Sequence, residues 1–324
     1  MLRKTFACAF FLALIFSTAA KAESDTTVTV ASLQFGTVNW LLDVIQHHRL
    51  DKKYGITLEI LPVASKNAAA VALQGEAAHI IVGDWFWVSR QRSAGQSFQF
   101  YPYSTASGGL ILQPDSSFRS LEDLRGKKIG IAGGKIDKSW LIMQAYSIQK
   151  TNSNIEDSIE TVYGAPPLLN ALLEQKKIDG VLTFWHYQAK LRAKNYPTVL
   201  GIRHILTELN VRPNVPINGW IFNQKWAEDN PRLINGFLNA AKDAAHIMKT
   251  SDKEWTRLKR KDIIKEDDDA ILDQLKKGYQ DGIPEQFTTE DARSAEKLFQ
   301  LVGKLGGSTL IGKSHTMAPN TFRE

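Results

Sequence analysis

Short apolar segments alternate with segments of helical periodicity along the first third of the chain. Residues 27–31 and 57–63 alternate between apolar and polar positions, and residues 78–84 are almost all apolar, as strands are. Residues 40–45 place apolar side chains on one helical face, and residues 67–74 form a second helical segment closed by a glycine. Strands separated by helices predict a parallel sheet covered on both faces, and so an α/β fold.

The middle of the chain repeats this pattern around residues 120–131, which read Ser-Leu-Glu-Asp-Leu-Arg-Gly-Lys-Lys-Ile-Gly-Ile. Ser120 can cap a short helical turn with acidic residues in its first turn, and the last apolar residues then start a strand. A glycine loop at 133–134 leads into a further helix. Predicted strands at 160–163 and 178–184 complete the pattern of a second sheet.

The first 22 residues have the pattern of a secretory signal. Arg3 and Lys4 precede an apolar run at 6–16, which is too short for a permanent membrane anchor, and small residues end the segment. Cys8, the single cysteine, lies early in this run, so lipidation is not expected. A mature chain without cysteine is compatible with the periplasm.

The net charge of the chain gives little indication of an anionic partner. The chain carries 40 Lys and Arg against 34 Asp and Glu, and removal of the signal leaves 37 basic residues. Basic residues cluster at 255–261, but acidic residues follow at 266–269, which indicates a solvated helix face. Nucleic-acid binding is therefore not expected.

Aromatic and charged side chains follow the predicted strands, and ligands bind at the carboxyl ends of strands in such sheets. Asp84-Trp85-Phe86-Trp87 places three rings beside a carboxylate, where they could stack on a ligand, although two of them could equally be core. The helix start near Lys138 offers free N–H groups suited to a carboxylate, sulfonate or phosphate, while Asp137 could cap that helix instead.

Three histidines each permit more than one interpretation. His47 and His48 end a helical segment and complement its dipole; they could also ligate a metal, but adjacent helical residues point to different sides, so no metal site is expected. His186 follows a strand and could be packed, could cap a helix, or could line the ligand site.

Three segments of the chain resemble segments of type II periplasmic solute-binding proteins: residues 120–131, the pair Gly83-Asp84 and the helix start at Asn230-Pro231. The resemblance is closer to the nitrate/sulfonate/taurine branch of ABC-importer binding proteins, which includes thiamine-precursor binders. Relatives commonly have an aromatic-Pro pair where this chain has Trp185-His186, and this difference leaves the substrate open.

The resemblance implies two domains, joined by two crossing segments, that close on a ligand. It places residues 23–105 and 219–324 in domain I and residues 106–218 in domain II, with helices of 262–306 packing on domain I. It implies a monomer that delivers a small molecule to an ABC permease and its ATPase, without a cofactor. Alternatives are a sensory or partner protein on this fold, or an enzyme related to thiamine-precursor synthases, although their cysteine-rich motif is absent here.

No enzymatic motif emerges from the sequence, and we expect a sulfonate, a carboxylate or an aromatic or heterocyclic ligand. The residues expected to line the ligand site follow predicted strands or lie in the crossings. They are Phe35, Thr37, Asn39, Trp40, Asp84, Trp85, Trp87, Thr105, Ser107, Lys135, Asp137, Lys138, Ser139, Tyr163, Trp185, His186, Asn218 and Trp220.

Overall fold

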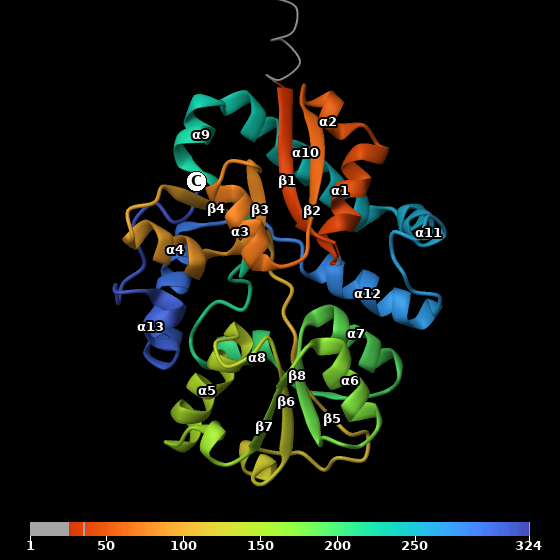
Figure 1. Ribbon diagram of the computed structural model, residues 1–324. Coiled ribbons are helices and arrows are strands. Elements are labelled where there is room, and N and C mark those ends of the chain that lie inside the picture. Colours follow the sequence, from red (N-terminus) through yellow and green to blue (C-terminus); the bar gives the residue numbers. More distant parts are fainter. Residues whose placement is uncertain (1–25, 35, 324) are drawn as a thin grey trace, which may run out of the picture.

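The computed structural model describes residues 26–34 and 36–323, so the expected signal segment and Phe35 lie outside the described residues. Two five-stranded sheets stand end to end, each flanked by helices (Figure 1). None of the helices in the described part of the chain has the length and apolarity needed to span a bilayer.

The first sheet has the order β2-β1-β3-β10-β4. Its first three members are parallel, and β10 runs antiparallel between β3 and β4, so the carboxyl ends of β1, β3 and β4 share an edge with the start of β10. This arrangement arises because β10 returns from the other sheet. The strands are β1 (Thr27–Leu33), β2 (Thr57–Val63), β3 (Ile80–Asp84), β4 (Phe98–Ser104) and β10 (Asn218–Asn223).

The second sheet has the order β7-β6-β8-β5-β9, with β5 antiparallel between β8 and β9. The carboxyl ends of its other strands share the edge that faces the first sheet (Figure 1). The strands are β5 (Gly109–Leu112), β6 (Lys128–Ala132), β7 (Glu160–Gly164), β8 (Gly180–Thr183) and β9 (Thr198–Gly201).

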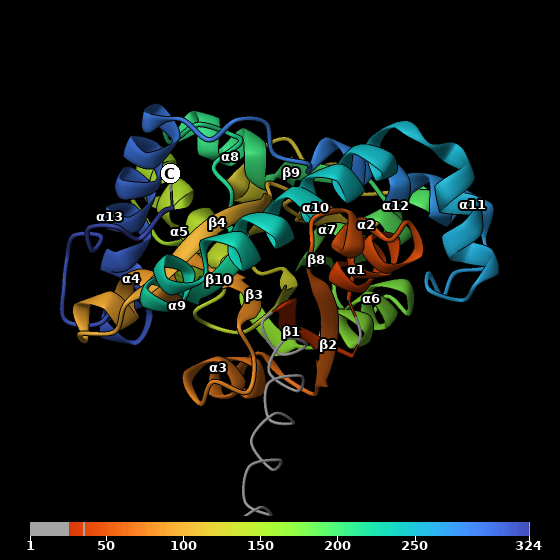
Figure 2. The ribbon, with the colours of Figure 1, turned by 90° about the horizontal axis from the view of Figure 1, so that it is seen from above.

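Helices cover both faces of each sheet (Figure 2). Around the first sheet lie α1 (Val38–His47), α2 (Leu50–Lys53), α3 (Lys66–Gln74), α4 (Trp85–Ser93), α9 (Gln224–Asp229), α10 (Pro231–Thr250) and α11 (Asp252–Arg260). Around the second lie α5 (Lys138–Thr151), α6 (Pro166–Glu174), α7 (Trp185–Ala193), α8 (Ile202–Glu208) and the 3-10 turns η2 (Leu121–Leu124) and η3 (Ile155–Asp157). The predicted Ser120 cap of η2 is confirmed as a capping box with Asp123.

The last two helices contact the second half as well as the first domain, on which the sequence led us to expect them. Helix α12 (Asp269–Asp281) lies against α7, and α13 (Thr289–Ile311) lies between α4 and α5. At Gly278 of α12 a Cβ would stand 2.9 Å from Trp185 Cε3, so the glycine allows this close approach. The last two helices therefore connect the two halves of the molecule, α12 on one side and α13 on the other.

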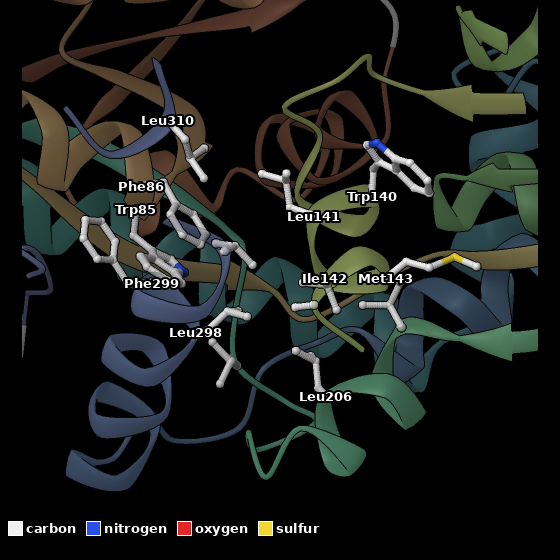
Figure 3. Packing of buried hydrophobic residues seen from close by; sticks show 14 of the residues in the cluster. Trp85, Phe86, Trp140, Leu141, Ile142, Met143, Leu206, Leu298, Phe299 and Leu310 are labelled. Atoms are coloured by element: carbon white, nitrogen blue, oxygen red, sulfur yellow. The ribbon is translucent and has the colours of Figure 1, made fainter. Parts of the chain in front are cut away.

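One hydrophobic core crosses from the first sheet to the second (Figure 3). Trp85 and Phe86 of α4 pack with Phe299 of α13, and the same cluster continues to Trp140 and Leu141 of α5. All five side chains are almost fully buried. The two halves are thus joined by apolar packing as well as by the chain crossings.

Candidate functional site

The facing edges of the two sheets form the candidate site. The chain passes from the first sheet to the second between Ser104 and Gly109, and it returns just before Asn218. In Figure 1 both crossings run between the halves. Loops that follow β1 and β3 therefore face loops that follow β6 and β8.

An ion pair connects the two halves on one flank of this interface. Lys138 Nζ, at the start of α5, lies 2.7 Å from Asp84 Oδ2, which ends β3. Both side chains are largely buried, with 23% and 15% of their surface exposed. The cation that the sequence suggested for a ligand is thus paired with a carboxylate of the opposite half.

The helix starts at this flank are capped by the chain itself. Asp84 Oδ1 accepts the backbone N–H of Trp87 at 3.0 Å, and Asp137 Oδ1 accepts that of Ser139 at 2.9 Å. An N-cap carboxylate satisfies the free N–H groups and carries a negative charge. These helix starts therefore do not offer an open site for an anion.

Burial and neighbouring lysines shift the pKa values of Asp84 and Asp137 in opposite directions. Burial raises the pKa of Asp84, but attraction to Lys138 and the hydrogen bonds outweigh it, and the net pKa is lowered. Burial raises the pKa of Asp137 above its ordinary value despite attraction to Lys138 and Lys66. Asp84 is the ionised partner of the pair, while Asp137 accepts a proton more readily.

On the other flank, rings from both halves form an aromatic cluster, defined here as Trp40, Tyr103, Trp185 and Tyr279. The Trp40 ring meets Trp185 edge-on at 6.3 Å between centroids, and Tyr279 lies 6.0 Å from Trp40. The hydroxyl oxygens of Tyr103 and Tyr279 are 3.4 Å apart. Burial raises the pKa of Tyr103 to about 12, so its hydroxyl stays neutral and can donate a hydrogen bond.

Three buried polar atoms without a hydrogen-bond partner lie at the facing edge of the second sheet: Trp140 Nε1, Thr183 Oγ1 and His186 Nδ1. An unsatisfied buried polar atom costs about 1–3 kcal/mol. Burial lowers the pKa of His186 to about 4, so its ring is neutral and can accept or donate one hydrogen bond. Two further unpaired atoms, on Gln113 and Asn170, belong to other parts of this half.

A cavity of about 210 Å³ adjoins the aromatic cluster. It is lined by Trp185 and Gln188 of α7, by Ser107 of the first crossing, and by Gln274 and Asp281 of α12. A second cavity, of about 400 Å³, lies beyond the carboxyl end of β5, at the edge of the second sheet away from the interface. Only the first therefore combines a crossing segment with a ring of the aromatic cluster.

The structure brings several predicted residues together and separates others. Trp40, Asp84, Asp137, Lys138, Trp185 and His186 lie at the facing edges, and Ser107 lines the smaller cavity. Thr37 is the N-cap residue of α1, and Asn218 begins β10 opposite Asp84. Lys135 is exposed over the Tyr163 ring, whose hydroxyl donates to Glu156 at 3.0 Å.

Trp85, Trp87 and Trp220 do not join the aromatic cluster; Trp85 and Trp220 are core residues, the alternative that the sequence also allowed for rings of residues 84–87. Trp85 is fully buried, and its indole N–H donates to the Pro216 carbonyl at 2.8 Å, so it anchors the second crossing. Trp87 packs on Phe98, at the end of β4 away from the crossing. Trp220 is 2% exposed and lies between Tyr103 and Phe237 in the core.

Two polar residues of the predicted set make hydrogen bonds that hold loops. Asn39 Oδ1 accepts from Ser32 Oγ at 2.8 Å, and Asn39 Nδ2 donates to the Leu33 carbonyl at 2.9 Å, which fixes the turn after β1. Thr105 Oγ1 accepts from Arg203 at 2.8 Å, and its backbone N–H donates to Gly282 at 2.8 Å. Ser139 contributes its backbone N–H to the Asp137 cap.

Sequence reasoning missed Tyr103, Tyr279 and Thr183. Thr183 lies near the end of the strand predicted at 178–184, so its position was a usable signal, and Tyr103 lies near the end of β4. Tyr279 lies on α12, and nothing in its local sequence indicates that this helix returns to the interface.

The two sheets, their shared crossings and their strand orders define the fold of type II periplasmic binding proteins. The NMT1/THI5-like family model matches residues 52–254, and the chain belongs to this family. The family resemblance and the fold predicted from the sequence are thereby confirmed. A search of curated protein sequences finds no significant match.

Solved structures with this fold include two sulfonate-binding proteins. The aliphatic sulphonate binding protein SsuA from Escherichia coli is 15% identical, with a TM-score of 0.65 over 92% of this chain and 94% of that one. The alkanesulfonate-binding protein SsuA from Xanthomonas axonopodis pv. citri, bound to MOPS, is 11% identical, with a TM-score of 0.65 over 92% and 98%. A DSZB variant in complex with biphenyl-2-sulfinic acid is 14% identical, with a TM-score of 0.60 over 87% and 92%.

Proposed function

We propose that the protein is a periplasmic solute receptor that closes on a small organic ligand and delivers it to an ABC-type permease and its ATPase. The observation that carries the proposal is the meeting of polar and aromatic side chains from both halves, at the Asp84–Lys138 pair and at Trp40 and Trp185. The fold and the solved binding proteins that share it support the same function. The proposal includes domain I at 23–105 and 219–324, domain II at 106–218, and a monomer.

The ligand that this interface suits is flat, weakly charged and able to form hydrogen bonds. The self-capped helix starts at Asp84 and Asp137 and the paired Lys138 disfavour a compact sulfonate. The aromatic cluster offers ring faces and edges, and the unpaired atoms of Thr183 and His186 offer hydrogen-bonding groups. Of the ligands expected from the sequence, the aromatic or heterocyclic class is therefore favoured.

Closure provides the signal to the permease. A ligand shifts the balance between open and closed forms only by its preference for the closed one. A ligand that contacts Trp40 on one half and Trp185 on the other has such a preference, because opening separates these residues. The permease then distinguishes the loaded receptor by its closed shape.

A thermal-shift screen tests the proposal. The protein would be mixed with thiamine precursors, aromatic acids and aliphatic sulfonates, and any hit would be checked by native mass spectrometry. We expect a melting temperature that rises with the concentration of a neutral aromatic or heterocyclic compound. Trp185→Leu should abolish the shift, and Trp87→Leu, a half-buried ring away from the interface, should keep it. An equal loss in both variants, or saturable binding of sulfonates alone, would count against this ligand class.

We further propose binding without catalysis, in contrast to an enzyme or a sensor on the same fold. The imidazole of His186, at the facing edge of the second sheet, is buried and neutral. Recovery of the ligand unchanged after long incubation, and capture of permease subunits by the loaded protein, are the expected results. Conversion of the ligand would favour the enzyme, and a loaded protein that captures no permease would favour the sensor.

A further inference from the structure

The ends of α1 and α11 bring two histidines and a glutamate together, away from the interface between the halves. The nitrogen and oxygen atoms that His47, His48 and Glu254 can offer to a metal all lie within 4.8 Å of one another. His48 Nε2 is 3.1 Å from Glu254 Oε2. Figure 1 shows α11 on the outer side of the domain, next to α1. His47 ends a ten-residue helix whose start faces the interface, so it lies about 15 Å along the helix from it.

The two histidines converge because the helix ends between them. The expectation that they point to different sides assumes regular helical geometry at both residues. His47 is the last residue of α1, and His48 is its C-cap, with φ −86° and ψ 4°. Their rings consequently lie 4.9 Å apart between centroids.

The carboxylate is held ready as a ligand. Glu254 is 5% exposed, and its Oε1 accepts from Arg257 Nε at 2.8 Å and from a second nitrogen of the same guanidinium at 2.6 Å. Burial raises the pKa of Glu254, but the hydrogen bonds from Arg257 and His48 outweigh it and lower the net pKa. Arg257 also pairs with Asp43. One carboxylate oxygen is thus fixed by an arginine, while the other faces the histidines.

We propose that His47, His48 and Glu254 bind a divalent transition metal of the Zn²⁺ type. Two imidazoles and one carboxylate form a known Zn²⁺ donor set, with water in the fourth position. Ligand atoms about 2.0–2.1 Å from the ion stand about 3.3 Å apart in a tetrahedron, close to the 3.1 Å between His48 and Glu254. The proposal requires the exposed His47 side chain, whose ligand atom lies within 4.8 Å of the other two, to turn toward the ion. Arg257 orients the carboxylate as outer-shell partners of metal ligands do.

Metal titration of the protein, purified without a polyhistidine tag, tests this site independently of the proposed function. We expect one equivalent of Zn²⁺ to bind in calorimetry, and Co²⁺ to give the visible absorption of a tetrahedral ion. His47→Ala should weaken Zn²⁺ binding at least about tenfold, and it should leave the fold intact because this side chain is exposed.

His246→Ala, which removes an exposed histidine of α10, is the matched control and should leave Zn²⁺ affinity unchanged. Two results would overturn the proposal: no saturable Zn²⁺ binding, which would leave His48, Glu254 and Arg257 as an ion-pair network, or equal affinity in the protein and in His47→Ala.

Discussion

The Asp84–Lys138 pair predicts a measurable coupling between the two halves. Lys138→Met removes the cation and leaves the largely buried carboxyl group of Asp84 without its charged partner. Exposed pairs contribute about 0.2–1 kcal/mol, and breaking a fully buried pair costs about 3–5 kcal/mol. With 23% and 15% of the side-chain surfaces exposed, this pair lies between those limits, so we expect the variant to lose about 2 kcal/mol of unfolding free energy.

A double-mutant cycle isolates the interaction. Asp84→Asn removes the charge but keeps an oxygen that can cap α4, because asparagine is as good an N-cap as aspartate. In that background Lys138→Met should cost less than about 0.5 kcal/mol, which gives a coupling energy of about 1.5–2 kcal/mol. Urea unfolding followed by circular dichroism and by tryptophan fluorescence gives the four free energies. Equal costs in both backgrounds would refute the reasoning, because they would show that the ligand-free protein does not keep the halves in contact.

Three further substitutions test other parts of the interface. Trp85→Phe leaves the Pro216 carbonyl without its hydrogen-bond donor and should lower the unfolding free energy by about 2–4 kcal/mol. A change below about 0.5 kcal/mol in urea unfolding would contradict the role of Trp85 in anchoring the second crossing. The pKa of His186 is lowered to about 4, so between about pH 6.5 and 4 this histidine binds a proton in the unfolded chain but not in the folded protein. Up to about 3 kcal/mol of unfolding free energy is therefore lost as pH falls through that window. His186→Gln should flatten this part of the pH profile of stability, and an unchanged slope would contradict the assignment to His186. Asp137 has the opposite effect on the pH dependence, because its pKa is raised on folding, so stability falls as pH rises from the ordinary pKa to the raised one. Asp137→Asn, which can retain the cap, should melt no lower than the unchanged protein at pH 7. A lower melting temperature of this variant at pH 7 would show that the carboxylate is stabilising.

The strand pattern was sufficient to predict an α/β fold with parallel-rich sheets, because apolar strands separated by amphipathic helices leave few other arrangements, whereas the two-domain arrangement came from the family resemblance. Ser120 illustrates how local this information is: its capping box with Asp123 is complete within four residues. The packing of α12 and α13 across both halves was not predictable in the same way. It depends on contacts between distant segments, such as Gly278 against Trp185.

The same distinction separates the predicted site residues that the structure brings together from those that it does not. Position after a strand brought Asp84 and Trp185 to the interface, since every parallel strand ends at the same edge. It did not determine which way a ring points. Trp85 follows Asp84 directly, yet as the first residue of α4 it turns into the core toward Phe299. The direction of a side chain at a helix start depends on tertiary packing, which the sequence pattern does not contain.

The carboxyl-terminal helices constrain any motion that admits a ligand. Tyr279 of α12 and Phe299 of α13 are buried with residues of the first half, Trp40 and Trp85, while the same helices also touch α7 and α5 of the second half. The ring contacts favour the first half: Tyr279 meets Trp40 and Trp255 there but Trp185 in the second half, and Phe299 meets Trp85 and Phe86. We therefore expect opening to keep both helices with the first half, at the cost of their apolar contacts with α7 and α5. Trp185 then loses its contacts with Trp40 and Tyr279 together, so its fluorescence is the signal in which opening should be seen.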